Sequence, residues 1–175
     1  AVIASDYKAL VCVFLAGGND YANTLIPWDT PNYNAYKSLR PVMGLERASL
    51  SATVLKPATA LPDGRAYALA PSLAPLMPIF NKGELAVMLN IGTLVEPTDK
   101  RTFTAGSVTL PARLFSHNDQ SSYWQACQCE GAISGWGGRM GDILMSGNGK
   151  AVFTGMTPAG STLFLSGEEA VAYQT

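Results

Sequence analysis

Residues 8–20 read Lys-Ala-Leu-Val-Cys-Val-Phe-Leu-Ala-Gly-Gly-Asn-Asp. In this stretch an unbroken apolar run, with several branched side chains, stops abruptly at a pair of glycines. A strand with one exposed face alternates apolar and polar residues, whereas an unbroken run of this kind is typical of a strand that is buried on both faces of a central parallel sheet. We therefore expect residues 9–16 to form such a strand.

The polar end of this run is a candidate ligand site. Ligands of open α/β sheets bind at the carboxyl ends of the strands, which is where Asn19 and Asp20 follow. Gly17 and Gly18 allow the backbone to approach a ligand closely, and the side-chain oxygens of Asn19 and Asp20 are hard ligands for a divalent cation. The same four residues also suit a plain turn, because glycine, asparagine and aspartate all tolerate turn conformations.

A second apolar run, residues 84–92, has the character of the first and also ends in glycine. Between the two runs we expect a helix over residues 31–39, capped by Thr30, and a second helix over residues 71–80. Strand, helix and strand in this order make a parallel crossover unit. The expected fold class is therefore α/β, mainly a parallel sheet with flanking helices, with two further short strands at residues 151–155 and 162–165.

A second constellation begins at Ser116 and His117, the one histidine of the chain. Ser116 suits an N-cap and Asp119 stands at the third helical position, so we expect a helix over residues 117–126. A hydroxyl at a helix N-terminus lies beside free N–H groups, which bind anions and lower the cost of an alkoxide. Ser116 and His117 are therefore candidate catalytic residues, although a plain cap and a first-turn surface histidine explain them equally well.

A Ser-His-Asp triad is not supported by this arrangement. Neighbouring residues in one helical turn point in different directions, so His117 cannot act as the base for Ser116. Attack by Ser116 would then require activation by a metal ion.

The segment 131–146 is expected to be architectural. Trp136, Met140, Ile143 and Leu144 in it fall on one helical face, and its glycines indicate close packing against the preceding helix.

Composition excludes several classes of function. Of the 175 residues, 47% are apolar and 14% are charged, which is typical of a globular chain. The net charge is −1 and no Lys/Arg cluster occurs, so nucleic-acid binding is not expected. No apolar segment approaches the roughly 18 residues of a membrane span, and no glycine-rich phosphate-binding motif follows either apolar run.

Five ordered blocks of the sequence resemble the secreted, uncharacterised bacterial family known as domain of unknown function fifteen-hundred-and-one. The blocks are residues 10–20 with Asn23, Thr24 and Pro27, residues 69–76, residues 83–87, Ser116 and His117 with Trp124 and Gln125, and residues 135–139. The family is related to the alkaline phosphatase and sulfatase superfamily, and its members commonly carry twin-arginine export signals. The resemblance implies a periplasmic or extracellular protein with an alkaline-phosphatase-like sandwich.

The resemblance also assigns roles to individual residues. It makes Asp20 a ligand for a divalent metal ion on the first strand and Ser116 a nucleophile. Members of the family carry Glu-Phe-Gly-Arg and Asp-His-Gly blocks that would complete a metal site, and neither block occurs here. Residues 1–175 are therefore expected to be the N-terminal portion of a single α/β domain, completed by the remainder of the same protein or by a second chain.

Two functions follow as expectations. The first is part of an exported metal-dependent hydrolase that acts on small phosphate or sulfate esters, with Asp20 and Asn19 at the metal and Ser116 and His117 in catalysis. The second is a non-catalytic secreted protein that uses the same fold for binding or assembly, which suits the low charge and the 17 glycines.

Overall fold

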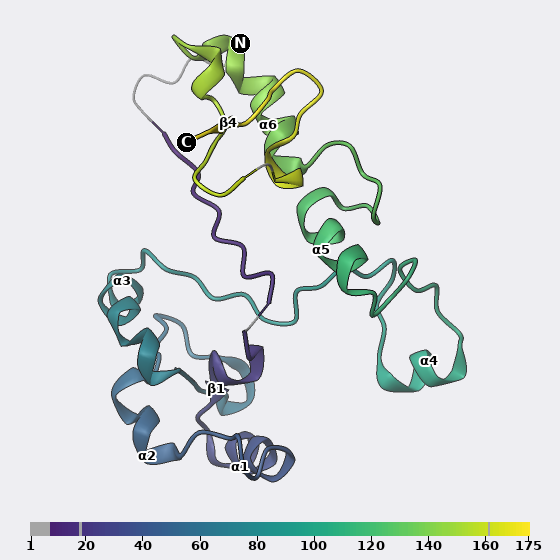
Figure 1. The fold of residues 1–175 in the computed structure, drawn as a ribbon. Helices are drawn as coiled ribbons and strands as arrows, with labels where there is room; N and C mark the ends of the chain where they lie inside the picture. Colours follow the sequence, from purple (N-terminus) through teal and green to yellow (C-terminus); the bar gives the residue numbers. More distant parts are fainter. Residues whose placement is uncertain (1–7, 18, 161) are drawn as a thin grey trace. The chain divides into compact units, whose positions relative to one another are not determined.

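The computed structural model describes residues 8–17, 19–160 and 162–175. The chain divides into two compact units (Figure 1). One comprises residues 14–90 and is called the 14–90 unit. The other comprises residues 8–13 and 91–175 and is called the C-terminal unit.

The 14–90 unit is built from short elements around one antiparallel strand pair. Its helices are α1 (Thr30–Leu39), α2 (Arg47–Leu50) and α3 (Met77–Asn81), its strands are β1 (Leu25–Pro27) and β2 (Tyr67–Leu69), and its 3-10 turns are Tyr21–Asn23, Ser51–Thr53, Pro62–Gly64 and Pro71–Leu76. In the strand pair, Ile26 lies opposite Ala68.

The core of the 14–90 unit lies between this strand pair and α1. Ile26 and Leu50 are fully buried, and Tyr33 and Tyr36 bring the inner face of α1 against them. Helix α1 was expected and is confirmed, but its cap is Asp29 instead of Thr30. One Asp29 oxygen accepts the Asn32 N–H at 3.1 Å and the other accepts the Ala66 N–H at 3.2 Å, so the cap also ties α1 to the segment before β2.

In the C-terminal unit most described residues lie outside helices and strands, and helices make up most of its regular structure. Its helices are α4 (Lys100–Ala105), α5 (His117–Ala126) and α6 (Trp136–Leu144), its strands are β3 (Met156–Thr157) and β4 (Tyr173–Gln174), and its 3-10 turns are Met145–Gly147, Ala151–Phe153 and Leu163–Leu165. The two strands pair in parallel, with Met156 opposite Tyr173. Helix α5 confirms the helix that the sequence predicts over residues 117–126, and α6 lies within the segment 131–146 that the sequence predicts to be helical.

Helix α6 packs through its glycines. Gly138 and Gly141 are buried against the segment 163–170, and the Gly135 N–H donates to the Ser166 carbonyl at 2.8 Å. The Trp136 ring meets the Phe164 ring edge-on, with 4.4 Å between centroids. The glycines pack closely, but the predicted partner is wrong, because they lie against residues 163–170 and not against the preceding helix. The apolar side chain of Ile143 is exposed.

The predicted parallel sheet is wrong. Within the described residues the strands form two sheets of two strands each, and only the short pair β3–β4 is parallel. Residues 9–16 are extended outside any strand, with Val11 and Val13 about four-fifths exposed, and residues 84–89 are likewise outside a strand, with Met88 exposed. An apolar run indicates only that its residues favour burial. A strand also needs a neighbour that supplies backbone hydrogen bonds, and the chain pairs neither run.

Two further strand predictions also fail. Residues 151–153 and 163–165 are 3-10 turns. Both runs are too short for a helical and an extended interpretation to be separated by their periodicity.

None of the helices in the described ranges combines the length and apolar character that a bilayer crossing requires.

Candidate functional site

Asp20 lies at the start of a 3-10 turn in the 14–90 unit. Its carbonyl accepts the Asn23 N–H at 3.0 Å and the Thr24 hydroxyl at 3.1 Å, so the backbone of residues 20–24 closes on itself. Asp20 therefore begins a turn. This turn ends one residue before β1, which holds it against the core.

The carboxylate of Asp20 is engaged by two donors. One of its oxygens forms an ion pair with the Arg40 guanidinium and also accepts the Asn23 amide N–H at 2.9 Å. Asn23 in turn accepts a hydrogen bond from the Tyr36 hydroxyl, which itself accepts the Leu45 N–H at 2.7 Å. The network ties the turn to α1 and to the loop that follows it.

These residues do not fit a divalent cation as they stand. Asp20 has one carboxylate oxygen outside the network, and the Asn19 side-chain oxygen accepts the Thr24 hydroxyl at 3.3 Å. Divalent cations such as Ca²⁺ take six or more oxygen ligands in proteins, and even a mixed site needs several charged or imidazole groups. In the described ranges, no three His, Cys, Asp or Glu side chains gather at one place.

Ser116 caps α5 in the C-terminal unit, as the sequence predicts. Its hydroxyl donates to one Asp119 carboxylate oxygen at 2.6 Å and accepts the Asp119 N–H at 3.4 Å. The side chain is half-buried. The hydroxyl hydrogen is therefore committed to a carboxylate, while the oxygen stays at the positive end of the helix.

Asp119 is the buried partner in this arrangement. Its side chain is 3% exposed, and its second oxygen accepts the Glu130 N–H at 2.9 Å and faces the Arg113 guanidinium at 3.6 Å. The hydrogen bond from Ser116, followed by that from the Glu130 amide, lowers the pKa of Asp119 below its ordinary value. The carboxylate is thus ionised at neutral pH and accepts hydrogen bonds on both oxygens.

The backbone before Ser116 is unusual. Arg113 and Phe115 both have positive φ, at 54° and 72°, a region that residues other than glycine seldom occupy. The Ser116 N–H donates to the Arg113 carbonyl at 2.9 Å and closes the turn. Strain of this kind concentrates at functional sites, where the surrounding structure maintains it.

His117 lies in the first turn of α5 with its side chain exposed. Among the described residues, no hydrogen bond or ion pair to its imidazole is found. The structure places Asn19 and Asp20 in the 14–90 unit and Ser116 and His117 in the C-terminal unit. Asn19 and Asp20 share a contact with the Thr24 hydroxyl. Arg40 joins Asp20, and Asp119 joins Ser116.

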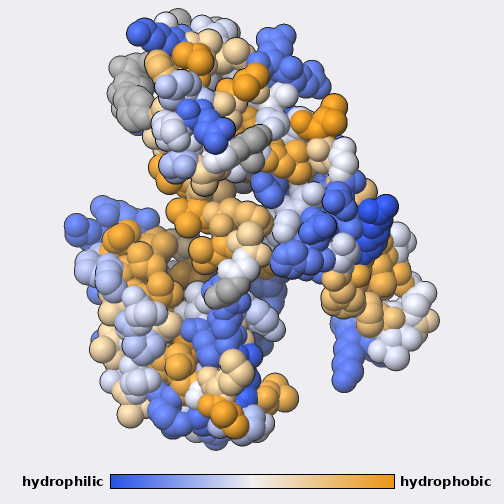
Figure 2. Space-filling view, in the orientation of Figure 1, coloured by the Kyte–Doolittle hydropathy of each residue, from blue (hydrophilic) through white to orange (hydrophobic). Residues whose placement is uncertain are grey.

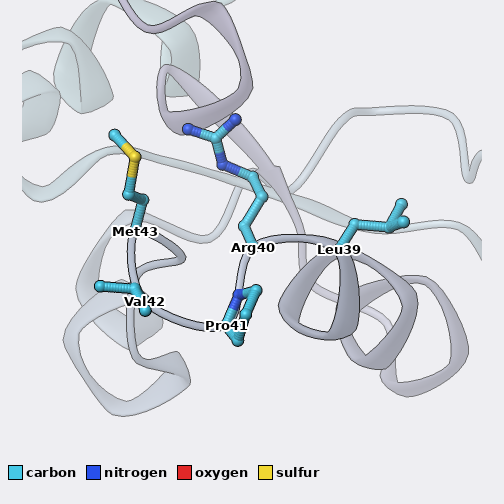
Figure 3. Close-up of a pocket in the computed structure, with 5 residues that line it drawn as sticks. All are labelled: Leu39, Arg40, Pro41, Val42 and Met43. Carbon is cyan, nitrogen blue, oxygen red and sulfur yellow. The ribbon is translucent and has the colours of Figure 1, made fainter.

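Shallow depressions occur on the surface of the described residues. One, of about 530 Å³, is lined by Lys100, Arg101, Thr104 and Ala105 of α4. Another, of about 240 Å³, is lined by Leu39, Arg40, Pro41, Val42 and Met43 (Figure 3). Neither contains a residue that the sequence predicts to be functional.

Sequence reasoning missed the role of Arg40. Arg40 stands 20 positions after Asp20, and no local pattern connects residues at that separation. The signal for Asp119 was present, because an acidic residue three positions after a serine cap belongs to the capping pattern.

The chain matches no protein-family model, no curated protein and no solved structure. The resemblance to the secreted bacterial family, and the metal ion and export that it implies, therefore stay predictions.

Proposed function

We propose that the chain is part of an exported bacterial hydrolase of phosphate or sulfate esters, with Ser116 as its nucleophile. One observation carries the proposal: the Ser116 hydroxyl lies 2.6 Å from an Asp119 oxygen at the N-terminus of α5. A carboxylate that accepts the hydroxyl hydrogen can take the proton when the oxygen attacks. The helix N-terminus offers N–H groups to the anionic part of a small ester.

The reaction divides into two displacements. In the first, the Ser116 oxygen bonds to phosphorus or sulfur, and the bond to the leaving oxygen breaks with its electron pair on that oxygen. The Ser116 proton passes to Asp119, and the leaving oxygen takes a proton from protonated His117. In the second, water attacks the same atom, the Ser116 oxygen leaves and recovers its proton from Asp119, and His117 accepts the proton of the water.

The lowered pKa of Asp119 makes it a weak base, which suits this class of reaction. In the loose transition state of phosphoryl transfer, the attacking oxygen forms little bond before the leaving bond breaks. Little proton transfer is then required at the start. A divalent ion would neutralise negative charge on the transferred group. The described residues do not fit such an ion, and the two displacements do not involve one.

A nucleophile substitution tests the proposal in the complete protein. Ser116→Asn keeps a side-chain oxygen that can cap α5 and an amide N–H that can donate to Asp119, but it removes the nucleophile. We expect hydrolysis of p-nitrophenyl phosphate or p-nitrophenyl sulfate to fall by about a thousandfold or more, with little change in the thermal midpoint.

Ser116→Thr is the matched control, because it retains a hydroxyl at the same place and should keep measurable turnover. Equal activity of the Asn variant and the unmodified protein would show that Ser116 is only a cap. If the complete protein hydrolyses neither ester, the proposal that it is a hydrolase is contradicted.

A second candidate function is binding or assembly without catalysis. Large apolar side chains are exposed along two extended segments, at Leu10, Val11, Val13 and Leu15 and at Met88, Ile91, Leu94 and Val95. Figure 2 shows apolar residues at the surface of both units. Surfaces of this kind mark protein contacts, so these segments favour a role in which further polypeptide covers them.

The native protein distinguishes the two candidates. Its intact mass is measured as the cell produces it, together with any chain that copurifies. For the hydrolase we expect this native protein to hydrolyse one of the two esters, whether or not a second chain copurifies. For the binding protein we expect a longer polypeptide or a copurifying chain that covers the exposed apolar segments, and no turnover of either ester.

A further inference from the structure

We propose that the Arg40 guanidinium takes the position at Asp20 that a divalent cation was expected to occupy. The turn after Gly17 would then carry a permanent cation that belongs to the chain itself. This proposal concerns the 14–90 unit and is independent of the role of Ser116.

The first argument is the position of Arg40. It follows the last residue of α1, its N–H donates to the Tyr36 carbonyl at 3.0 Å, and its carbonyl accepts the Gly44 N–H at 2.8 Å. A Cβ on Gly44 would lie 2.6 Å from that carbonyl, so the turn depends on a residue without a side chain. The backbone is thus held on both sides. The Arg40 side chain points away from the backbone of residues 41–43 (Figure 3), and its guanidinium pairs with the Asp20 carboxylate.

The second argument is the orientation of Asn23. Its amide oxygen accepts the Tyr36 hydroxyl, and its NH₂ group donates to Asp20 at 2.9 Å and to the Met43 carbonyl at 3.0 Å. Asn23 therefore presents hydrogen-bond donors to Asp20 and keeps its oxygen away. A cation site requires the reverse orientation, because oxygens must converge on the ion.

The third argument is charge. Asp20 and Arg40 form an ion pair in which the two side chains are 34% and 25% exposed. A divalent ion bound to the remaining Asp20 oxygen would lie next to the guanidinium, and at such short range the repulsion of like charges is large. Arginine also stays charged at any pH that a folded protein tolerates. The carboxylate is thereby neutralised without a metal.

Terbium luminescence tests the proposal, because Tb³⁺ is a hard cation like Ca²⁺ and nearby tyrosine or tryptophan rings sensitise it. Five forms of the complete protein are titrated: unmodified, Asp20→Asn, Arg40→Gln, Arg40→Lys and Arg40→Gln with Asp20→Asn. We expect Arg40→Gln to bind Tb³⁺ about tenfold or more tightly than the unmodified protein, because the competing charge is gone. Arg40→Lys keeps the charge and should resemble the unmodified protein, and the double variant should lose the gain.

Two results would overturn the proposal. One is an unmodified protein that binds Tb³⁺ through Asp20 at least as tightly as Arg40→Gln does, as judged by loss of the signal in Asp20→Asn. The other is a folded Arg40→Gln variant with no gain that depends on Asp20. If Arg40→Gln does not fold, the Tb³⁺ affinities of the unmodified protein and of Asp20→Asn are compared. A weaker affinity in Asp20→Asn shows that Tb³⁺ binds through Asp20 and contradicts the proposal. Equal affinities support the proposal. Neither titration depends on ester hydrolysis, so failure here is distinct from failure of the Ser116 assignment.

Discussion

Gly138→Ala should destabilise the C-terminal unit by about 3 kcal/mol or more, because the added methyl group has no room. A Cβ at this position would lie 2.1 Å from the Ser166 carbonyl carbon and oxygen and 2.3 Å from the Gly167 nitrogen. All three are backbone atoms, which cannot move aside by rotating a side chain. Urea unfolding followed by tryptophan fluorescence measures the loss, and hydrogen exchange of residues 163–170 should show that this segment leaves α6.

Gly141→Ala is the matched control on the same helix. Its Cβ would lie 3.1 Å from the Ala170 methyl, a tight contact that a small shift relieves. The gain in helix propensity from glycine to alanine is close to 1 kcal/mol and offsets that cost. Equal effects of the two substitutions would contradict the packing of α6 on residues 163–170.

Loss of the Asp142 carboxylate should also release residues 168–170 from α6. Its two oxygens accept the N–H groups of Glu168 at 2.9 Å, Glu169 at 3.0 Å and Ala170 at 2.7 Å. Asp142→Ala leaves all three donors without this partner, whereas Asp142→Asn retains one oxygen acceptor. We expect the thermal midpoint to fall in both variants, and to fall further in Asp142→Ala.

The pH dependence of this loss of stability shows whether the negative charge of Asp142 is responsible for it. The hydrogen bond from Ala170, followed by those from Glu168 and Glu169, lowers the pKa of Asp142 below the ordinary aspartate value of 3.8. The stabilisation is therefore fully present above pH 3.8 and is lost as the pH falls through the lower pKa of the folded state. The difference in stability between the unmodified protein and Asp142→Asn should shrink below pH 3.8. A difference that is constant from pH 7 to pH 2 would contradict the role of the charge.

Local features of the sequence predicted local features of the structure. Helix α1, helix α5 with its Ser116 cap, and helix α6 follow from caps and spacing within one or two turns. Each of these signals involves residues that are three or four positions apart, so it can be recognised without knowledge of the rest of the fold.

Contacts between distant positions could not be predicted in this way. Asp20 pairs with Arg40, and Asp142 pairs with the amides of residues 168–170, across 20 and up to 28 positions. The parallel sheet failed for the same reason, because the apolar run at residues 9–16 does not specify which strand, if any, pairs with it. Of the candidate site, the cap at Ser116 was predictable, but the donors that engage Asp20 were not.

The exposed apolar run at residues 10–15 has a consequence for synthesis in the cell. A ribosome adds about 5 to 20 residues per second, so these residues emerge roughly ten seconds or more before residue 175. During that interval an extended apolar stretch with free backbone groups can pair with its copies on neighbouring nascent chains. Production of this protein therefore depends on how quickly a chaperone or a partner segment reaches the stretch, and a low temperature with slow expression should give the higher soluble yield.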